Sequence, residues 1–202
     1  TTQLGTTVSP SDRLELDGKI LQAESKNVYI MLNKPEKVMS TSSDPEGRPT
    51  VTQLIDLPYR LYPVGRLDYN TSGLILLTND GDAAYRLTHP KYEIEKEYLA
   101  VIKGEIDRRD ILKLERGVQI EETITTAPAK VSVTGGTQHT VTLSITIHEG
   151  RNREVRKMLE AIDKELLSLM RIRIGNINLG KLSSGAYREL NSTELAYINS
   201  LK

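Results

Sequence analysis

The sequence predicts an α+β fold, with a mixed and largely antiparallel β-sheet flanked by helices. Residues 95–102 and 140–148 alternate between apolar and polar side chains, as half-buried strands do. Residues 107–115 have the periodicity of an amphipathic helix instead. These elements follow one another without the regular alternation of parallel βαβ units, which favours α+β over α/β.

Residues 1–27 are expected to lie outside the main domain. Short strands around Val8 and at 14–16 flank a turn that contains Pro10, and this is too little to form a core. The polar residues 22–27 are typical of a linker. The main domain is therefore predicted over residues 28–202.

The first half of the main domain shows a strand at 28–32, which Pro35 would stop. The continuous apolar run at 74–77 predicts a short buried strand. A helix is expected after Gly81, and it should end at the His89-Pro90 pair because a residue before proline disfavours helical backbone.

In the second half, Asp107 is a plausible N-cap and Gly117 a stop for the helix at 107–115. Strands at 127–133 and 140–148 flank Thr-Gly-Gly-Thr, which predicts a hairpin with its turn at 134–137. A strand follows at 166–174. The final helix is expected to start at Asn191, with Glu194 completing a capping box.

Composition narrows the classes of function. The 202 residues include 27 basic and 27 acidic ones, and zero net charge argues against nucleic-acid binding by bulk charge. The absence of cysteine excludes disulfides and thiol catalysis, and the three histidines have no metal-binding spacing. Without an apolar run of membrane-spanning length or a signal peptide, we expect a cytoplasmic protein that needs no membrane.

The loop at residues 65–73 is the strongest candidate for a functional site. Asp68 is the only acid between Asp56 and Asp80, and glycines bracket it at 65 and 73. The buried strand that follows would hold Asp68 at a sheet edge, where a lone carboxylate suits a nucleophile or a charge that meets one substrate atom. The same composition is also ordinary turn chemistry, so the loop alone leaves a purely structural role open.

Four further motifs, in order along the chain, accompany the loop at residues 65–73. Gly-Arg-Leu-Asp at 65–68, followed by Thr-Ser-Gly-Leu and Leu-Thr-Asn-Asp-Gly, resembles the signature loop of ribosomal-RNA pseudouridine synthases of the RsuA type. The segments Asn-Lys-Pro at 33–35, Lys-Glu-Tyr at 96–98, 149–159 and 171–180 resemble the other motifs of that family. The resemblance covers nearly the whole chain from residue 28.

The resemblance implies a role for particular residues. Asp68 would be the catalytic residue, acting as nucleophile or base on a flipped-out uridine, and the sequence does not choose between a covalent and a glycal route. Arg156 would keep Asp68 ionised and aligned, since an adjacent cation favours the charged carboxylate. Tyr98 would lie against the uracil, and Arg66 is a further candidate for substrate binding. The reaction is expected to need no cofactor and no metal.

A local basic stripe is expected to contact RNA although the chain is neutral. We predict contacts from five residues in three of these motifs: Lys34, Arg151, Arg153, Lys157 and Arg171.

The expected substrate is a specific uridine in ribosomal RNA, as free rRNA or in a ribosome assembly intermediate. Details of the motifs look closer to the large-subunit branch, so 23S rRNA is preferred over 16S, and we expect a monomer. Residues 1–21 resemble the end of an S4 RNA-binding domain; its helical first part is missing and the chain does not begin with Met, which suggests a truncated or processed chain.

Two other classes of function remain open from the residues alone. One is an rRNA-binding module that has kept the fold without the chemistry. The other is a carboxylate-dependent hydrolase, which would need a second acid near Asp68, and Asp80 and Asp82 are the nearest candidates.

Overall fold

The structure is a computed structural model that describes residues 9, 12–21 and 26–201. The strand expected around Val8 and most of the linker expected at 22–27 lie outside these residues. Strands β1 (Leu14–Leu16) and β2 (Lys19–Leu21) form a small antiparallel hairpin. Leu14, Leu16 and Ile20 are exposed there, which agrees with a segment that has no core of its own.

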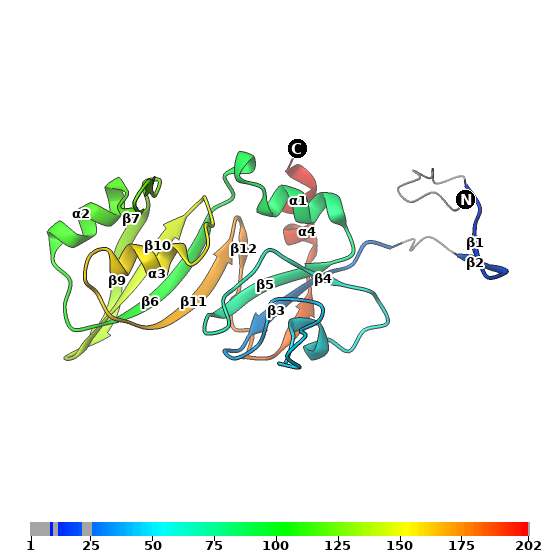
Figure 1. Cartoon of the computed structure of the whole chain (residues 1–202), viewed down its shortest axis with the longest axis horizontal. Coiled ribbons are helices and arrows are strands. Elements are labelled where there is room, and N and C mark those ends of the chain that lie inside the picture. Colours follow the sequence, from blue (N-terminus) through cyan, green and yellow to red (C-terminus); the bar gives the residue numbers. More distant parts are fainter. Residues whose placement is uncertain (1–8, 10–11, 22–25, 202) are drawn as a thin grey trace.

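Nine strands of the described chain form one sheet in the order β13-β3-β5-β11-β6-β10-β9, with β4 beside β5 and β12 beside β11 (Figure 1). They are β3 (Tyr29–Lys34), β4 (Tyr62–Val64), β5 (Ser72–Thr78), β6 (Lys96–Lys103), β9 (Lys130–Thr137), β10 (Thr140–Ile147), β11 (Leu166–Ile174), β12 (Ile177–Asn178) and β13 (Tyr187–Glu189). Within the described residues, β5 with β11 is the one parallel pair of this sheet, so the predicted mixed, largely antiparallel architecture is confirmed. Strands β7 (Gln119–Glu121) and β8 (Ile124–Thr125) form a separate hairpin.

The helices begin and end at local signals. They are α1 (Gly81–Thr88), α2 (Arg108–Arg116), α3 (Glu154–Glu160), α4 (Ser192–Ser200) and the 3-10 turns η1 (Val51–Leu54) and η2 (Pro90–Tyr92). The Asp107 carboxylate accepts from the Asp110 amide at the start of α2, and Gly117 ends that helix. Asn191 and Glu194 form the predicted capping box of α4. The start of α2 at Asp107, its end at Gly117 and the start of α4 at Asn191 were predicted from the sequence and are confirmed.

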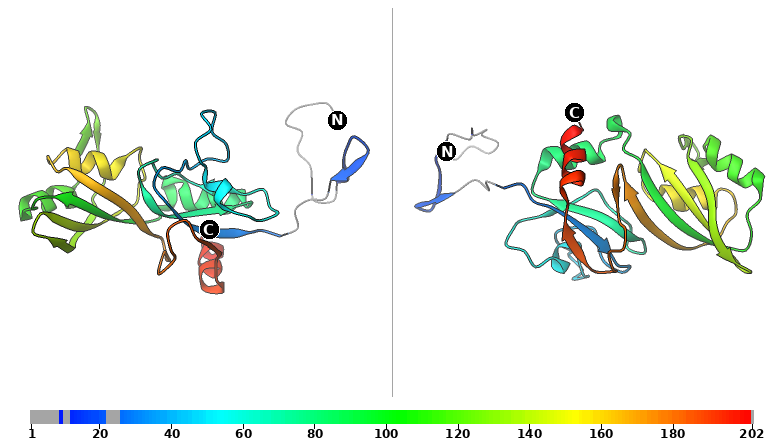
Figure 2. Two further views of the ribbon diagram at one scale, coloured as in Figure 1. Left: turned by 90° about the horizontal axis from the view of Figure 1, so that it is seen from below. Right: turned by 180° about the vertical axis from the view of Figure 1, so that it is seen from behind.

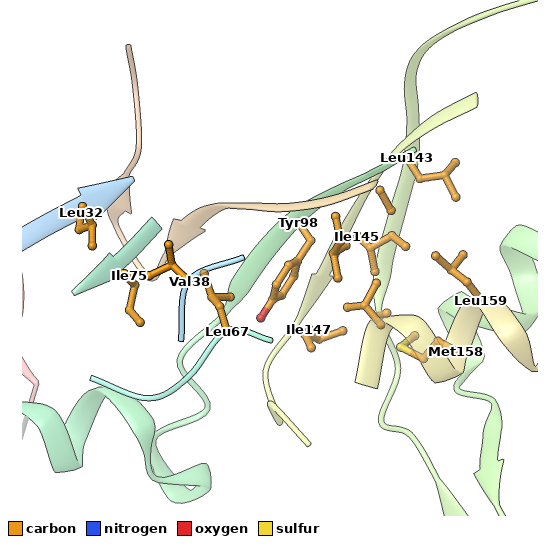
Figure 3. Packing of buried hydrophobic residues seen from close by; sticks show 14 of the residues in the cluster. Leu32, Val38, Leu67, Ile75, Tyr98, Leu143, Ile145, Ile147, Met158 and Leu159 are labelled. Atoms are coloured by element: carbon orange, nitrogen blue, oxygen red, sulfur yellow. The ribbon is translucent and has the colours of Figure 1, made fainter. Parts of the chain in front are cut away.

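Two apolar clusters lie on opposite faces of the sheet. The first combines β3, β5, β6 and β10 with α3, with Val38 and with Val51 of η1. The second packs α1 and α4 against the other face of β3 and β5, through residues such as Leu76 and Ile198. Seen from below, the loop that carries η1 stands on one face and α4 on the other (Figure 2). Tyr98 belongs to the first cluster and lies on the same face of the sheet (Figure 3).

Strand β5 is not at the edge of the sheet, as its loop was expected to be. It lies between β3 and β11, and Ile75 and Leu77 point into one cluster while Leu74 and Leu76 point into the other. A run that is apolar at every position is buried on both faces, which is the environment of a central strand. Asp68 therefore precedes the middle of the sheet, where neighbouring strands can supply partners.

The β9–β10 hairpin turns later than predicted. Strand β9 continues through Thr137, and the turn is formed by Gln138 and His139. The pairing shifts register between Thr142 and Leu143 and passes over Thr134, so Gly135 and Gly136 continue the strand beside this irregularity. Glycines serve bulges as well as turns, and local sequence does not distinguish the two uses.

Candidate active site

Asp68 lies in the loop between β4 and β5, and buried polar contacts hold this loop. The hydroxyl of Ser40 donates to the Leu67 carbonyl oxygen at 2.8 Å and accepts from the Leu67 amide at 3.1 Å. The Lys34 ammonium donates to the carbonyl oxygens of Pro35 and Val38, both at 2.9 Å, and of Tyr69 at 3.4 Å. The backbone on both sides of Asp68 is thereby fixed.

Lys34 is fully buried, with none of its surface exposed. Burial lowers the pKa of its ammonium to about 8, against the opposing effect of the Glu36 and Asp68 carboxylates. The structure thus places Lys34 beneath the Asp68 loop, and the predicted direct contact between Lys34 and RNA has no exposed surface to use. Its charge supports the loop that carries Asp68.

Arg156 joins the first turns of α3 to the Asp68 loop. Its Nε lies 3.3 Å from Oδ2 of Asp68, and its Nη2 donates to the Asn70 carbonyl at 2.7 Å and to the Thr71 hydroxyl at 2.9 Å. The Asp68 side chain is 29% exposed and that of Arg156 is 18% exposed. The carboxylate is therefore paired with a cation and still open to an incoming molecule.

The start of α3 is built around a buried carboxylate. Glu154 is 3% exposed and accepts from the backbone amides of Gly150 at 2.8 Å and Arg151 at 2.7 Å. Burial is the main cause that raises the pKa of this carboxyl group. Arg153, immediately before the helix, has a left-handed backbone with φ of 53°. These contacts orient α3 so that Arg156, one turn further along, faces Asp68.

A cavity of about 420 Å³ opens beside Asp68. Its walls combine the Asp68 loop with β6, β11 and the segment leading into α3, and they include Tyr98, Leu169 and Val155. Tyr98 is 9% exposed, and its ring extends from β6 among Leu67, Ile145 and Ile147 (Figure 3). The site is thus a concave surface lined by both apolar and charged side chains, with the Asp68 carboxylate exposed at its side.

Three cationic residues of the predicted site have partners within the protein. Arg171 is 5% exposed, donates from Nε to the Leu74 carbonyl at 2.8 Å and lines the cavity. Arg151 pairs with Glu149 at 2.7 Å, and Lys157 pairs with Glu121 at 2.6 Å. Arg66 and Arg153 are exposed at the cavity and form no ion pair within the part of the chain that the structure describes.

Lys96 also lines the cavity, although the sequence did not predict it as a site residue. It is 8% exposed on β6, two residues before Tyr98 and on the same face of the strand. The available signal was a lysine at an inward position of an alternating strand, where apolar side chains belong.

Among the residues described, no group of three histidine, aspartate or glutamate side chains is placed to hold a metal ion. In the same residues, no helix combines the length and the apolar character needed to cross a bilayer.

Comparison with known proteins points to the same region of the chain as the geometry of the site. The family described as RNA pseudouridylate synthase matches residues 28–161, which include Asp68, Tyr98 and Arg156. The chain is 45% identical to ribosomal large subunit pseudouridine synthase B of Bacillus subtilis, over 99% of this chain and 82% of that protein. It is 42% identical to the protein of the same name from Yersinia pestis, over 96% of this chain and 63% of that one. A crystal structure of a pseudouridylate synthase superposes with a TM-score of 0.80 at 31% identity, over 96% of this chain and 83% of that chain.

Proposed function

The chain belongs to the family of RNA pseudouridine synthases, and from this premise we propose that it isomerises a specific uridine of ribosomal RNA to pseudouridine. The proposed substrate is the large-subunit (23S) rRNA. The names of the Bacillus subtilis and Yersinia pestis relatives support this choice. The single observation that carries the assignment is the Asp68–Arg156 pair at the mouth of the cavity that Tyr98 lines.

The reaction begins when the target uridine leaves its stack and enters the cavity, because an enzyme cannot work on a base inside a helix. The glycosidic C1′–N1 bond breaks, the uracil turns, and C5 rejoins C1′. Asp68 opens the sequence, either by attacking C1′ or by taking a proton from the sugar. The 29% exposure of its side chain supports direct contact with the ribose.

Arg156 positions the carboxylate for this step. It bonds both Asp68 and the backbone two residues later, so the carboxylate and its loop move as one unit. Positioned groups contribute to rate because they remove the entropy cost of finding the reactive geometry.

Tyr98 supplies the surface on which the uracil packs. An aromatic ring stacks on an unpaired base without regard to the surrounding sequence. The burial of its ring among Leu67, Ile145 and Ile147 keeps this surface fixed.

Arg66 and Arg153 are the proposed phosphate contacts, since both are exposed at the cavity and free of carboxylate partners within the described residues. Arg151 and Lys157 would join them by exchanging Glu149 and Glu121 for phosphate. Arg171 acts inside the cavity, and Lys34 acts through the Asp68 loop.

Further features of the proposal concern the whole protein. Residues 28–202 are the catalytic domain, and residues 1–21 are the end of an S4-like RNA-binding domain. The enzyme acts as a monomer in the cytoplasm, on rRNA or on a ribosome assembly intermediate. The match of the family to residues 28–161 supports the placement of the catalytic domain.

An RNA-binding module without catalysis is the alternative. Such a module needs no carboxylate facing an anionic ligand, whereas here an arginine on a separate helix holds Asp68 at the cavity. This arrangement favours the enzyme.

The test is release of tritium from C5-labelled uridine in rRNA, because C5 must lose its hydrogen when it bonds to the sugar. The parent chain should release tritium, and mapping of the modified position should place it in 23S rRNA. Asp68→Asn should abolish release and leave the fold intact, because Asp68 is partly exposed. The control Asp56→Asn, at an exposed position, should behave as the parent. Release by Asp68→Asn at the parental rate would refute the assignment.

A further inference from the structure

Lys96 carries a buried charge that the proposed roles of Asp68, Arg156 and Tyr98 do not use. Its ammonium donates to the His148 carbonyl at 3.3 Å and forms no ion pair within the described residues. An ammonium has three donors, so Lys96 has hydrogen-bonding capacity left on the cavity wall.

The groups around Lys96 leave a net positive charge. Arg171 from β11 and Glu154 from α3 are the charged groups that act on it, and the loop after β10 contributes the backbone of His148 and Gly150. When all three are ionised, two cations and one carboxylate sum to +1. Glu154 already accepts two backbone amides, and one nitrogen of Arg171, Nη2, has no hydrogen-bond partner.

Burial of this net positive charge destabilises the fold, and a structural role alone does not explain it. An uncompensated buried cation loses its hydration, and an apolar residue of similar size would fill this position more favourably. Burial is the main cause that lowers the pKa of Lys96 to about 8, and Arg171 adds to it while Glu154 opposes it. The arrangement is better explained by a negative charge that enters the cavity during the reaction.

The proposed reaction produces such a charge. When C1′–N1 breaks, its electron pair passes into the uracil ring and spreads over N1 and the carbonyl oxygens. If Asp68 attacks C1′, the carboxylate becomes a neutral ester as the uracil becomes an anion. If Asp68 takes a sugar proton instead, the negative charge again moves from Asp68 to the uracil.

We propose that Lys96 is a further catalytic residue, which donates a hydrogen bond to a carbonyl oxygen of the uracil and stabilises the uracil anion while it is detached from the sugar. This inference rests on the proposed function and holds for both routes. Lys96 shares a face of β6 with Tyr98, so the group that packs on the base and the group that meets its oxygen come from one strand.

An RNA phosphate is the other anion that could meet Lys96. Phosphates remain at the solvent-exposed rim, where Arg66 and Arg153 are exposed. Lys96 is 8% exposed, and its cross-strand neighbour on β10 is the buried Ile147. The depth of Lys96 therefore favours the base over the backbone.

The first experiment compares Lys96→Met, Lys96→Arg and the control Lys103→Met under single-turnover conditions with saturating rRNA. Lys103 lies on the same strand but is exposed and paired with Glu165. Lys96→Met should lose about 100-fold in rate, the effect of removing one donor to a developing anion, with RNA affinity within about threefold of the parent. Lys96→Arg should recover part of the rate, and Lys103→Met should match the parent.

A second measurement separates catalysis from structural support. Fluorine at C5 withdraws electrons and makes the uracil a better leaving group, so its anion needs less stabilisation. Loss of 5-fluorouridine from the RNA should be slowed only about tenfold by Lys96→Met, against about 100-fold for loss of uridine. Equal defects on the two substrates would overturn the proposal, because a distorted site slows both alike.

The pH profile gives a third readout. The ammonium must be protonated to donate to the anion, so kcat/KM of the parent should fall as pH rises through about 8. Lys96→Met should lack this fall. If kcat/KM of Lys96→Met still falls over this pH range, the titrating group is another residue, such as Lys34, whose pKa is also lowered to about 8.

The outcomes distinguish the two proposals. A parent chain without tritium release on 23S or 16S rRNA would reject the proposed function itself. An active parent with an unaffected Lys96→Met variant would reject only the role of Lys96. A loss confined to RNA affinity would identify Lys96 as a phosphate contact and would also overturn its proposed role.

Discussion

At the scale of single residues, Arg156 connects two parts of the chain that are 88 residues apart. Its guanidinium uses Nε for Asp68 and Nη2 for the backbone carbonyl of Asn70 and the hydroxyl of Thr71. A planar fork of donors can satisfy these partners together, whereas an ammonium is a single point charge. The geometry of the pair therefore depends on arginine as well as on positive charge.

We accordingly expect Arg156→Lys to keep the fold and to lose about 100-fold in single-turnover rate, the scale of a catalytic group displaced by about 1 Å. Arg156→Met should lose more, because it also removes the charge that pairs with Asp68. Tritium release with saturating rRNA measures both variants, and circular dichroism controls for folding. A parental rate in Arg156→Lys would contradict the positioning role.

Lys34 and Lys96 show how one residue type takes different roles through its contacts. Lys34 donates to three backbone carbonyls and is fully buried, so its donors are used inside the protein. Lys96 donates to one carbonyl and lines the cavity. Its remaining donors are available to a substrate.

At the scale of elements, the close approach of β5 and β11 is made possible by Gly73. Its φ is 102°, and a Cβ at this position would collide with the backbone of Arg171. The parallel pairing of the two strands joins Met170 with Ser72 and Arg171 with Gly73. This contact sets the Asp68 loop beside the strand that carries Arg171 and Leu169.

Gly73→Ala should therefore lower the free energy of unfolding by about 3 kcal/mol, because it combines overpacking with backbone strain. Gly135→Ala is the matched control. A Cβ at Gly135 meets no atom within 4 Å, so its effect should stay within about 0.5 kcal/mol. Denaturant unfolding of the three proteins measures the difference, and equal midpoints would show that the strands can separate at little cost.

At the scale of the whole molecule, the chain has no net charge, yet it exposes arginines beside the cavity, where RNA would bind. Arg66 and Arg153 border the cavity, while Arg151 and Lys157 nearby are paired with carboxylates. Local arrangement of charge, more than its sum, determines whether a surface attracts RNA. The neutral composition was thus weak evidence against an RNA substrate.

Arg153→Gln should weaken rRNA binding and reduce the slope of log K against log salt by about 0.7, the value for one lost phosphate contact on single-stranded RNA. Lys103→Gln, at an exposed position on β6, should leave both quantities unchanged. Binding titrations at several salt concentrations provide the measurement. An unchanged slope in Arg153→Gln would remove this residue from the RNA path.

The sequence by itself determined the features that depend on neighbours along the chain. The caps at Asp107 and Asn191, the strand at 166–174 and the class of the fold were all predicted and are confirmed. The position of the β9–β10 turn was wrong, because a glycine pair suits a bulge as well as a turn.

Only the tertiary structure decided which charged residues are buried and what they face. Lys34 and Arg171 look like surface cations in sequence, and the alternation of β6 shows only that Lys96 shares a face with apolar residues, yet all three lie inside the molecule. Burial arises from strands that pair across long separations, as β5 does with β11, and no local pattern records that pairing. The same packing turns Lys96 toward the cavity beside Tyr98, so the charge proposed to meet the uracil became visible only once the sheet was assembled.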